Sequence, residues 1–383
     1  MIENIILYGG GRWSKVWFGV LNKAIQKKIN IIIIPGRGYE SFVSFLSKTT
    51  THHHILIYQS APNTFPINTL AIIANSAGDH FRAASHLLNL KIPVLVEKPV
   101  SLSVHQIQAL IELSNVNRTI IAPAHVYKYS NYLVNFKQYL KLEDLPSKID
   151  IEWTDSEGES TQGFSKNYDA GIPVFYDCMP HIVSLIEVVF ESSPSFKGNL
   201  EVENGGSKVT FLLSVKGINC NVLLQRNAKE RNRKITVTKI DGDYSLDFKT
   251  EPGQIFTKDL LFCADKNWPG EKTPLEKMIN DFIDLVERGD IPDGNFNLKT
   301  ALTSSKISEE INKRYKKIMA KEIQKILDKK SITSKDSIYA IRDFFRLDRN
   351  FLQLNLIKKV LFLKKNYKNL SLISVFKIAK NIN

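Results

Sequence analysis

Short apolar runs alternate with amphipathic stretches through the first third of the chain. Brief apolar runs bounded by turn residues are typical of buried strands, and helical spacing between them is typical of amphipathic helices. Strands are predicted at residues 5–8, 31–34, 55–58, 70–74, 94–96 and 119–122, and helices after residue 11, at 79–90 and at 104–113. Strands that alternate with helices in this way predict an α/β domain with a parallel, doubly wound sheet.

The pattern changes beyond residue 200, where strand-like runs follow one another closely. They cover residues 208–215, 219–224, 234–239 and 244–248. Asp241-Gly242-Asp243 separates the last two runs and is a favourable hairpin turn. The short spacing between the runs predicts a meander of antiparallel hairpins.

A third pattern occupies the end of the chain. Residues 322–330 and 337–345 have the pattern of short helices, and from residue 351 onward seven lysines and no acidic residue are interleaved with apolar side chains. A basic amphipathic helix of this kind can bind an anionic membrane surface or an acidic partner. Its apolar side can equally pack on the body of the protein or on a second subunit, and the tail 351–383 alone does not decide between these interpretations.

Length and composition are those of a soluble globular protein. A chain of 383 residues exceeds one ordinary domain, so two domains with an appendage are expected. With 43% hydrophobic and 24% charged residues, collagen-like, low-complexity and wholly disordered classes are excluded. Three dispersed cysteines without a CxxC pair argue against a disulfide framework. The start lacks a signal-peptide pattern and no apolar run approaches the roughly 18–20 residues of a membrane span, so a cytoplasmic protein is expected.

The net charge of +13 is concentrated in the tail. From Lys321 onward there are fifteen basic and five acidic residues, so the tail carries +10 and the body only +3. Nucleic-acid binding by the body therefore loses its main compositional support. No metal site is expected either, because the adjacent His52, His53 and His54 precede a strand, where neighbouring side chains point to opposite faces.

A glycine-rich turn follows the first predicted strand directly. It contains Gly9, Gly10, Gly11, Arg12, Trp13 and Ser14 and leads into the first helix. In a dinucleotide-binding βαβ unit, the first glycine permits the tight turn and the second lets a pyrophosphate approach the backbone. The third position needs a small residue for helix packing, which Ser14 supplies, and the phosphates lie on the helix N-terminus. A tight turn without a ligand is the alternative.

The end of the second predicted strand bears on the choice between NAD and NADP. NAD-binding domains usually carry an acidic residue there for the ribose 2′-hydroxyl, whereas this chain has Arg37 and no acid before Glu40. A guanidinium suits a 2′-phosphate, and Arg12 can assist. We therefore predict NADP as the preferred cofactor over NAD, with a plain surface arginine as the alternative.

Several motifs, in order along the chain, resemble the glucose–fructose oxidoreductase / inositol dehydrogenase / rhizopine-catabolism (Gfo/Idh/MocA) family. They are the glycine turn, the Asn75-x4-His80 loop, Glu97-Lys98-Pro99 after the fifth strand, the D-x-x-x-H element from Asp177 to His181, and a helix that starts at Thr273-Pro274-Leu275-Glu276. The resemblance covers about residues 1–320. It implies a Rossmann domain, which we place at 1–125, and an α/β domain on an open, largely antiparallel sheet at 126–320. The family does not require the basic helical extension at 321–383.

The resemblance also implies a reaction, in which a nicotinamide cofactor moves a hydride to or from a carbon that bears oxygen, most often in a sugar or cyclitol. It places Asn75, His80, Glu97 and Lys98 at the cofactor site, with the Lys98 ammonium on the reacting oxygen. His181 is the best proton carrier, because an unperturbed pKa of about 6.5 lets it act as acid or base. Asp177 shares a helical face with His181 and orients it or takes the proton itself. A solvated strand end and a surface helix pair are the structural alternatives.

The chain departs from the family pattern around this element. Met179 stands where a glycine is usual, and Ser184 replaces a common aspartate. Tyr127, Lys128 and Trp153 are candidates to line the substrate site, with Lys128 near the usual arginine position. Aromatic packing accounts equally well for Tyr127 and Trp153. These changes bear on the substrate more than on the reaction.

Three functions stay open at this point. The first is an NAD(P)-dependent oxidoreductase acting on a sugar or sugar-nucleotide, with surface-carbohydrate biosynthesis as its setting. The second is an imine reductase of the thiazolinyl-imide type, acting on a carrier-tethered intermediate that meets the basic tail. The third is a nucleotide-binding regulatory or scaffold protein without turnover. Dependence on both Lys98 and His181 would favour the first. A homo-oligomer with a small-molecule substrate and no nucleic-acid partner is expected.

Overall fold

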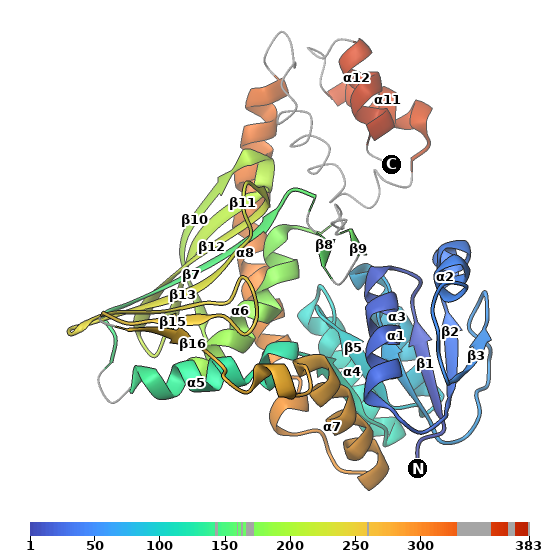
Figure 1. The fold of residues 1–383 in the computed structure, drawn as a ribbon. Helices are drawn as coiled ribbons and strands as arrows, with labels where there is room; N and C mark the ends of the chain where they lie inside the picture. Colours follow the sequence, from blue (N-terminus) through green and yellow to red (C-terminus); the bar gives the residue numbers. More distant parts are fainter. Residues whose placement is uncertain are drawn as a thin grey trace.

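The computed structural model describes residues 1–141, 145–158, 160–161, 164–165, 172–258, 260–327, 354–366 and 372–381. A six-stranded sheet and an eight-stranded sheet organise the body of the protein, with helices between them and at the C-terminal end (Figure 1). The predicted fold class, a Rossmann-type parallel sheet followed by a mostly antiparallel sheet and a helical basic extension, is confirmed.

The first sheet is entirely parallel. Its strands are β1 (Asn4–Tyr8), β2 (Asn30–Ile34), β3 (His54–Ile57), β4 (Thr69–Ile73), β5 (Val94–Glu97) and β6 (Ile121–Ala124), in the order β3-β2-β1-β4-β5-β6. Each lies within two residues of its predicted position. The strand order reverses between β1 and β4, and ligands of open α/β sheets bind in the crevice beside such a reversal.

Alternation along the strands explains why helices cover both faces of this sheet. Ile5 and Leu7 point to the face that packs on α1 (Arg12–Ala24), α2 (Tyr39–Leu46) and α7 (Pro274–Arg288). Ile6 points to the opposite face, which packs on α3 (His80–Asn89), α4 (Val104–Asn117) and the start of α8 (Lys299–Leu327). The first core therefore includes α7, from a segment well beyond residue 125. Thr273 and Glu276 form a capping box at the start of α7.

The second sheet is mostly antiparallel. Its strands are β7 (Lys148–Ser156), β10 (Ser195–Glu203), β11 (Lys208–Val215), β12 (Ile218–Ala228), β13 (Asn232–Lys239), β14 (Gly242–Asp247), β15 (Gln254–Phe256) and β16 (Leu261–Cys263), in the order β10-β11-β12-β7-β13-β14-β15-β16. A separate short hairpin joins β8 (Ser160–Thr161) and β9 (Phe164–Ser165).

The predicted meander is correct at β11–β12 and β13–β14 and wrong between β12 and β13. There β7 is inserted, parallel to β12 and antiparallel to β13. The reason is that β7 continues the buried face of the sheet with Ile149, Ile151 and Trp153, and pairing with both neighbours buries these side chains. Nearest-neighbour spacing along the chain cannot reveal a strand that enters from 60 or more residues away.

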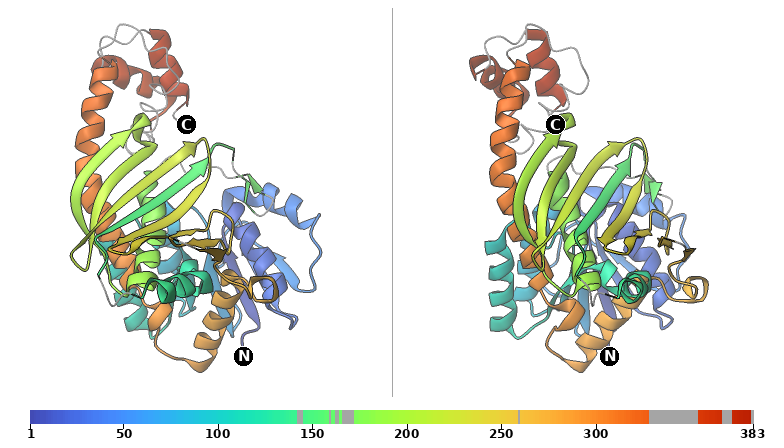
Figure 2. Two further views of the ribbon diagram at one scale, coloured as in Figure 1. Left: turned by 60° about the vertical axis from the view of Figure 1, so that its left-hand side comes forward. Right: turned by 90° about the vertical axis from the view of Figure 1, so that its left-hand side faces the viewer.

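Two helices, α6 (Val174–Phe190) and α8, cover one face of the second sheet, and α5 (Asn131–Leu140) packs beside α6 (Figures 1 and 2). The 29-residue α8 continues to Leu327. The separate short helix predicted at 322–330 is therefore wrong over its described part. The cause is a continuous apolar stripe of Ile307, Ile311, Tyr315, Met319 and Ile323, four residues apart, which all join the second core.

In the part that the structure describes, the C-terminal extension forms the helices α11 (Leu356–Asn366) and α12 (Leu372–Asn381) at the far end of α8, and these pack on each other (Figure 2). Leu363, Val375 and Ala379 are buried and join the second core. The helix predicted at 337–345 lies outside the described residues. Among the helices that the structure describes, none is long and apolar enough to span a membrane.

Candidate active site

A cleft of about 1450 Å³ separates the carboxyl ends of the N-terminal strands from the second sheet. One wall comprises the loops after β1, β2, β4 and β5, and the other comprises side chains of β7, α6, β12 and β13. The volume exceeds the roughly 300–1,000 Å³ of a pocket for one small molecule. The cleft therefore has room for a dinucleotide together with a second ligand.

The glycine turn lines the first wall of the cleft. Two of its positions, Gly9 and Gly10, have no room for a side chain. Gly9 has φ +139°, and a Cβ there would lie 2.5 Å from the Ser14 hydroxyl and 2.7 Å from the Ala74 backbone. A Cβ on Gly10 would lie 2.5 Å from the Pro35 carbonyl oxygen. At Gly11 a Cβ would meet nothing within 4 Å.

Helix α1 begins immediately after this turn, at Arg12. Its first backbone N–H groups lack partners within the helix and carry the positive end of the helix dipole, which suits a phosphate. Ser14 is fully buried and donates from Oγ to the Ala74 carbonyl oxygen at 3.2 Å, so this small residue ties α1 to β4. The Arg12 guanidinium lies 5.2 Å from the centroid of the Trp13 ring, and both residues line the cleft.

Arg37 lies in the short turn Gly36–Gly38 directly after β2. Its side chain is exposed and lines the cleft. No acidic residue stands at this end of β2. The position is the one at which a Rossmann domain meets the ribose 2′-substituent.

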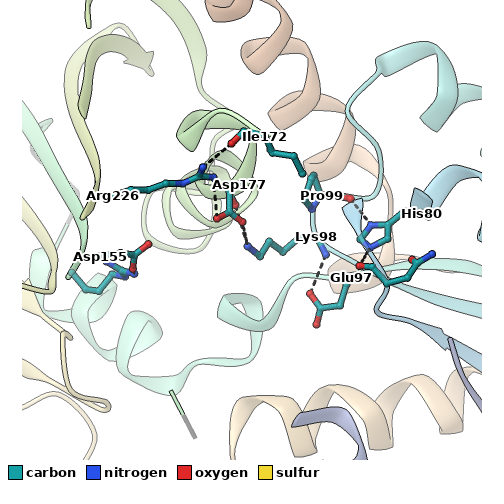
Figure 3. A network of polar contacts seen from close by, with 10 residues as sticks. His80, Glu97, Lys98, Pro99, Asp155, Ile172, Asp177 and Arg226 are labelled. Atoms are coloured by element: carbon teal, nitrogen blue, oxygen red, sulfur yellow. Dashed lines mark hydrogen bonds and ion pairs between the residues drawn. The ribbon is translucent and has the colours of Figure 1, made fainter. Parts of the chain in front are cut away.

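His80 joins two loops of the first wall. Its Nδ1 lies 2.8 Å from the Pro99 carbonyl oxygen, and its Nε2 lies 3.1 Å from the Asn75 carbonyl oxygen (Figure 3). Burial lowers the pKa of His80 despite these two carbonyl contacts. The ring therefore holds the loop after β4 against the loop after β5, whereas the buried Oδ1 of Asn75 has no partner within the described protein.

Glu97 ends β5 and is buried. Its Oε1 accepts a 2.8 Å hydrogen bond from Trp17 Nε1, and its Oε2 accepts one of 3.1 Å from the Lys98 backbone N–H. Burial raises the pKa of this carboxyl group. Both oxygens thus serve to fix the backbone from which the next residue, Lys98, projects.

Lys98 and Asp177 meet across the cleft. Lys98 Nζ donates to Asp177 Oδ1 at 2.6 Å and to the Asp177 carbonyl oxygen at 3.2 Å (Figure 3). Burial alone would lower the pKa of Lys98, but the Asp177 carboxylate outweighs it and the pKa is raised. Arg226, from β12, places its guanidinium 3.5 Å from the other Asp177 oxygen. One carboxylate therefore holds two cations, and Lys98 stays an ammonium.

His181 lies one turn after Asp177 on α6, as the helical spacing predicted. Its ring stacks on Trp153 at 5.0 Å between centroids and 16° between planes, and it meets the Tyr127 ring edge-on at 5.0 Å. Burial lowers the pKa of His181 well below its usual value, and the nearby Lys98 ammonium lowers it further. The imidazole is therefore neutral at pH 7 and able to accept a proton.

Sequence reasoning missed several charged residues of the second wall, among them Asp155, Arg226, Arg231 and Arg233. Asp155 and Arg233 form an ion pair with both side chains only 2% exposed. A signal existed in the strand periodicity. Asp155 shares the inward face of β7 with Trp153, and Arg233 stands beside Trp153 in the β7–β13 register. Charged residues at inward positions mark a site or an internal ion pair.

Lys128 does not join the other predicted substrate residues. Tyr127 and Trp153 line the cleft, whereas the Lys128 ammonium lies 3.2 Å from Glu187 on α6. Glu187 also accepts a hydrogen bond from Thr300 at the start of α8. Lys128 therefore links η3 (Val126–Tyr129) to two helices, and it does not line the cleft.

A family model described as "Oxidoreductase family, NAD-binding Rossmann fold" (GFO_IDH_MocA) matches residues 19–125. This match confirms the predicted resemblance, the oxidoreductase class and a nicotinamide dinucleotide as the cofactor class. A search of curated protein sequences finds no match to this chain.

Solved structures share the fold at low identity. A 3-ketoreductase variant from Actinomadura kijaniata, in complex with TDP-benzene and NADP, has a TM-score of 0.65 at 11% identity and covers 82% of this chain and 98% of its own. myo-Inositol dehydrogenase from Lactobacillus casei, in complex with NAD(H) and myo-inositol, has 0.61 at 13%, covering 82% and 95%. A UDP-N-acetylglucosamine 3-dehydrogenase from Acidithiobacillus ferrooxidans has 0.59 at 15%, covering 81% and 97%.

Proposed function

On the premise that the N-terminal domain belongs to the Gfo/Idh/MocA oxidoreductase family, we propose that this protein is an NADP-preferring enzyme that interconverts a carbonyl and a hydroxyl group on a sugar or sugar-nucleotide. The observation that carries the proposal is the contact of Lys98 with Asp177 at 2.6 Å, beside His181. A loop of the first sheet and a helix packed on the second sheet thus place an ammonium and a neutral imidazole in one cleft.

The residues of the first wall fit a dinucleotide. The cradle at Gly9 and Gly10 has no room for a Cβ, and the N-terminus of α1 follows at once, so the pyrophosphate would lie there. Asn75, with its unpartnered buried Oδ1, faces the same cleft. Arg37 would bind the 2′-phosphate of NADP, with assistance from Arg12. When bound, the nicotinamide ring supplies or accepts the hydride.

Residues of both walls would handle the proton and the charge on oxygen. Lys98 Nζ donates to the reacting oxygen and stabilises the negative charge that grows there. His181, held neutral, takes the proton from the substrate hydroxyl during oxidation and returns it during reduction. Asp177 keeps Lys98 charged and aimed into the cleft, and Arg226 fixes the second Asp177 oxygen. Tyr127 and Trp153 present aromatic faces suited to the apolar face of a sugar ring.

A sugar or sugar-nucleotide is the substrate class that we infer, with a role in surface-carbohydrate biosynthesis as its setting. The cleft offers several charged and aromatic side chains beyond the reacting centre, among them Arg231 and Lys249 at its outer part. The similar structures named above include a dehydrogenase named for a UDP-sugar and a ketoreductase bound to a TDP compound. An imine reductase would not need the Lys98–His181 pair, and a scaffold protein would bind nucleotide without turnover.

The first experiment is a titration of the full-length protein with NADPH and with NADH, followed by nicotinamide fluorescence. We expect NADPH to bind more tightly and Arg37→Ala to weaken NADPH by about tenfold, the loss of one charge-assisted contact, with NADH unchanged. NADH serves as the internal control, since it lacks the 2′-phosphate. If neither nucleotide binds, the proposal fails; if both bind equally in both proteins, only the 2′-phosphate assignment fails.

The tail supplies a second surface, which we propose contacts an anionic membrane. Packing of α11 on α12 buries Leu363 and Val375 but leaves Ile357, Leu361 and Ile373 more than 60% exposed. Seven lysines and no acidic residue lie beyond residue 350. Apolar side chains among lysines match an anionic lipid surface, whereas an acidic protein requires only the charges.

Vesicle sedimentation tests this contact. The full-length protein should sediment with phosphatidylglycerol vesicles and remain in solution with phosphatidylcholine vesicles. Leu361→Glu with Ile373→Glu should abolish the effect, while Val116→Glu, on an exposed apolar residue of α4, serves as the matched control. If the double variant still bound the vesicles, charge alone would account for the binding, and an acidic partner would be favoured.

We further propose a cytoplasmic setting and a homo-oligomer. The free thiols of Cys178, Cys220 and Cys263 suit a reducing compartment.

A further inference from the structure

The indole of Trp153 contacts two groups that matter for proton transfer. The His181 ring stacks on it at 5.0 Å, and the guanidinium carbon of Arg233 lies 3.9 Å from its centroid. Tyr127 meets both Trp153 and His181 edge-on, at 5.6 Å and 5.0 Å between centroids. The His181 imidazole thus packs with the rings of Tyr127 and Trp153, and Arg233 lies against the Trp153 ring.

Arg233 is held firmly in this place. It is 2% exposed, forms an ion pair with Asp155 and donates to the Thr154 carbonyl oxygen. Its backbone stands opposite Trp153 in the β7–β13 register, so neighbouring strands bring the guanidinium and the indole together. A planar guanidinium can lie on an aromatic ring and stays charged at any pH at which the protein folds, which a lysine at this position would not match.

We propose that Arg233 is a positioning residue for His181: through Trp153 it fixes the ring on which the imidazole stacks, and it keeps a permanent positive charge beside that imidazole. The proposal rests on the proton-transfer role of His181 given above. Asp155 in turn stabilises the charge of Arg233, since a buried guanidinium needs a paired carboxylate.

The consequence is control of when His181 carries a proton. The charged and titratable groups that face it are Lys98 from the loop after β5, Asp177 on its own helix, Arg233 from β13 and His125 from the end of β6. Asp177 favours the imidazolium, and the three others oppose it. Lys98 is engaged with the reacting oxygen during the reaction, so Arg233 is the cation that remains constant through the cycle.

The test is an NMR titration of histidine side chains in the full-length protein, without substrate. The chain has eight histidines, so His181→Asn identifies the signal of interest. The double variant Asp155→Asn with Arg233→Gln removes both charges and leaves no buried ion unpaired. We expect the His181 titration midpoint to rise in it, while the midpoint of His53, which directly precedes β3 in the first sheet, stays fixed.

Trp153→Phe is the second variant, in case the double variant does not fold. The smaller ring keeps an aromatic surface but loses part of the contact with Arg233 and His181, so the His181 midpoint should again rise. A His181 midpoint equal to that of the unmodified protein, in whichever variant folds, overturns the proposal. A purely structural role for Arg233 would lower thermal stability and leave this midpoint unchanged.

The titration also separates this inference from the proposed function. A midpoint that moves as expected in a protein without any hydride transfer would uphold the role of Arg233 and refute the oxidoreductase mechanism. Turnover with an unmoved midpoint would do the reverse. In an active enzyme, the acidic limb of kcat/KM for oxidation should shift to higher pH in the double variant, because His181 then gains its proton earlier.

Discussion

The two walls of the cleft are built from different parts of the chain. In the first wall, the backbone of the glycine turn lines the cleft beside side chains such as Arg37. Ser14, His80 and Glu97 use their polar atoms to hold neighbouring parts of the chain together. In the second wall, charged and aromatic side chains themselves face the cleft, and strands and a helix distant in sequence bring them together. The first wall tolerates little change at its glycines, while the second depends on a few side-chain contacts.

The difference shows how each wall acquires its chemistry. A cofactor site built on backbone can bind the same dinucleotide whatever the substrate. The substrate site proposed on side chains of β7, β12 and β13 can change its ligand through single substitutions, because each strand contributes alternate residues to the cleft. The variants below act on one wall or the other, in order of decreasing expected effect.

The largest effect is expected for Lys98, the residue that joins the walls. Lys98→Met removes the ammonium next to Asp177 and should lower kcat by about 10²–10³, as for the loss of one group that stabilises charge on oxygen. Steady-state kinetics with a substrate of the proposed class and a fluorescence titration of NADPH measure the two walls separately. We expect the dinucleotide Kd to change far less than kcat.

Lys128→Met is the matched control for this substitution. Lys128 is as buried as Lys98, with 10% of the side chain exposed, and is also paired with a carboxylate, but it lies outside the cleft. Lys128→Met should lower the midpoint of thermal unfolding and leave kcat unchanged. Equal losses of kcat in the two variants would show that the paired lysines serve stability and would refute the role given to Lys98.

In the glycine turn, the addition of a single methyl group tests the structure of the first wall. Gly9→Ala places a methyl group 2.5 Å from Ser14 Oγ at a φ of +139°, and should cost about 2–3 kcal/mol of unfolding free energy, with loss of NADPH binding. Gly11→Ala adds the same methyl group where nothing lies within 4 Å, and should change stability by less than about 1 kcal/mol. Urea unfolding of both variants is the measurement, and similar losses in the two would contradict the cradle.

A smaller effect concerns the stability of the protein in acid and arises at His125, which directly follows β6. His125 is 2% exposed, neither of its ring nitrogens has a partner in the described protein, and burial lowers its pKa to about 3. The unfolded chain binds a proton below about pH 6.5 that the folded protein rejects, so stability falls as pH drops through this range. At pH 5 the loss is about 2 kcal/mol.

His125→Leu should remove this part of the acid sensitivity. We expect the unfolding free energy at pH 7.5 to change by less than about 1 kcal/mol, because no hydrogen bond is lost, and the difference between pH 7.5 and pH 5 to become smaller. Urea unfolding of both proteins at pH 7.5 and at pH 5 measures these free energies. An unchanged difference would mean that His125 is protonated in the folded state or bonded to water.

The first wall could be predicted closely from the sequence because its information is local. Ile5 to Ser14 contain a strand, a turn and a helix start within ten residues, and Glu97 and Lys98 follow their strand directly. Local spacing also placed Asp177 and His181 on one helix face. What local spacing could not supply was the partner of each side chain: that Glu97 binds Trp17, and that His80 spans two loops, depends on packing between elements.

The second wall was predicted only in part for the same reason. Trp153 was named as a candidate, but Arg233 lies 80 residues later and is its neighbour only because β7 enters the sheet between β12 and β13. Lys128 was named as a candidate because the resemblance puts it near the family's usual arginine position, but it does not line the cleft. Its ammonium pairs with Glu187 on α6, and Glu187 accepts a hydrogen bond from Thr300 at the start of α8. Sequence spacing could not place these helices beside Lys128.

Helix α8 spans the whole body of the molecule. Leu298, directly before the helix, and Ala301 in its first turn pack under the first sheet, and the stripe from Ile307 to Ile323 packs under the second. At about 1.5 Å per residue its 29 residues form a rod of about 43 Å. One continuous helix therefore packs on α4, which covers the first sheet, and on α6 and β10 of the second body. A substitution that interrupts this helix would weaken the packing behind both walls at once.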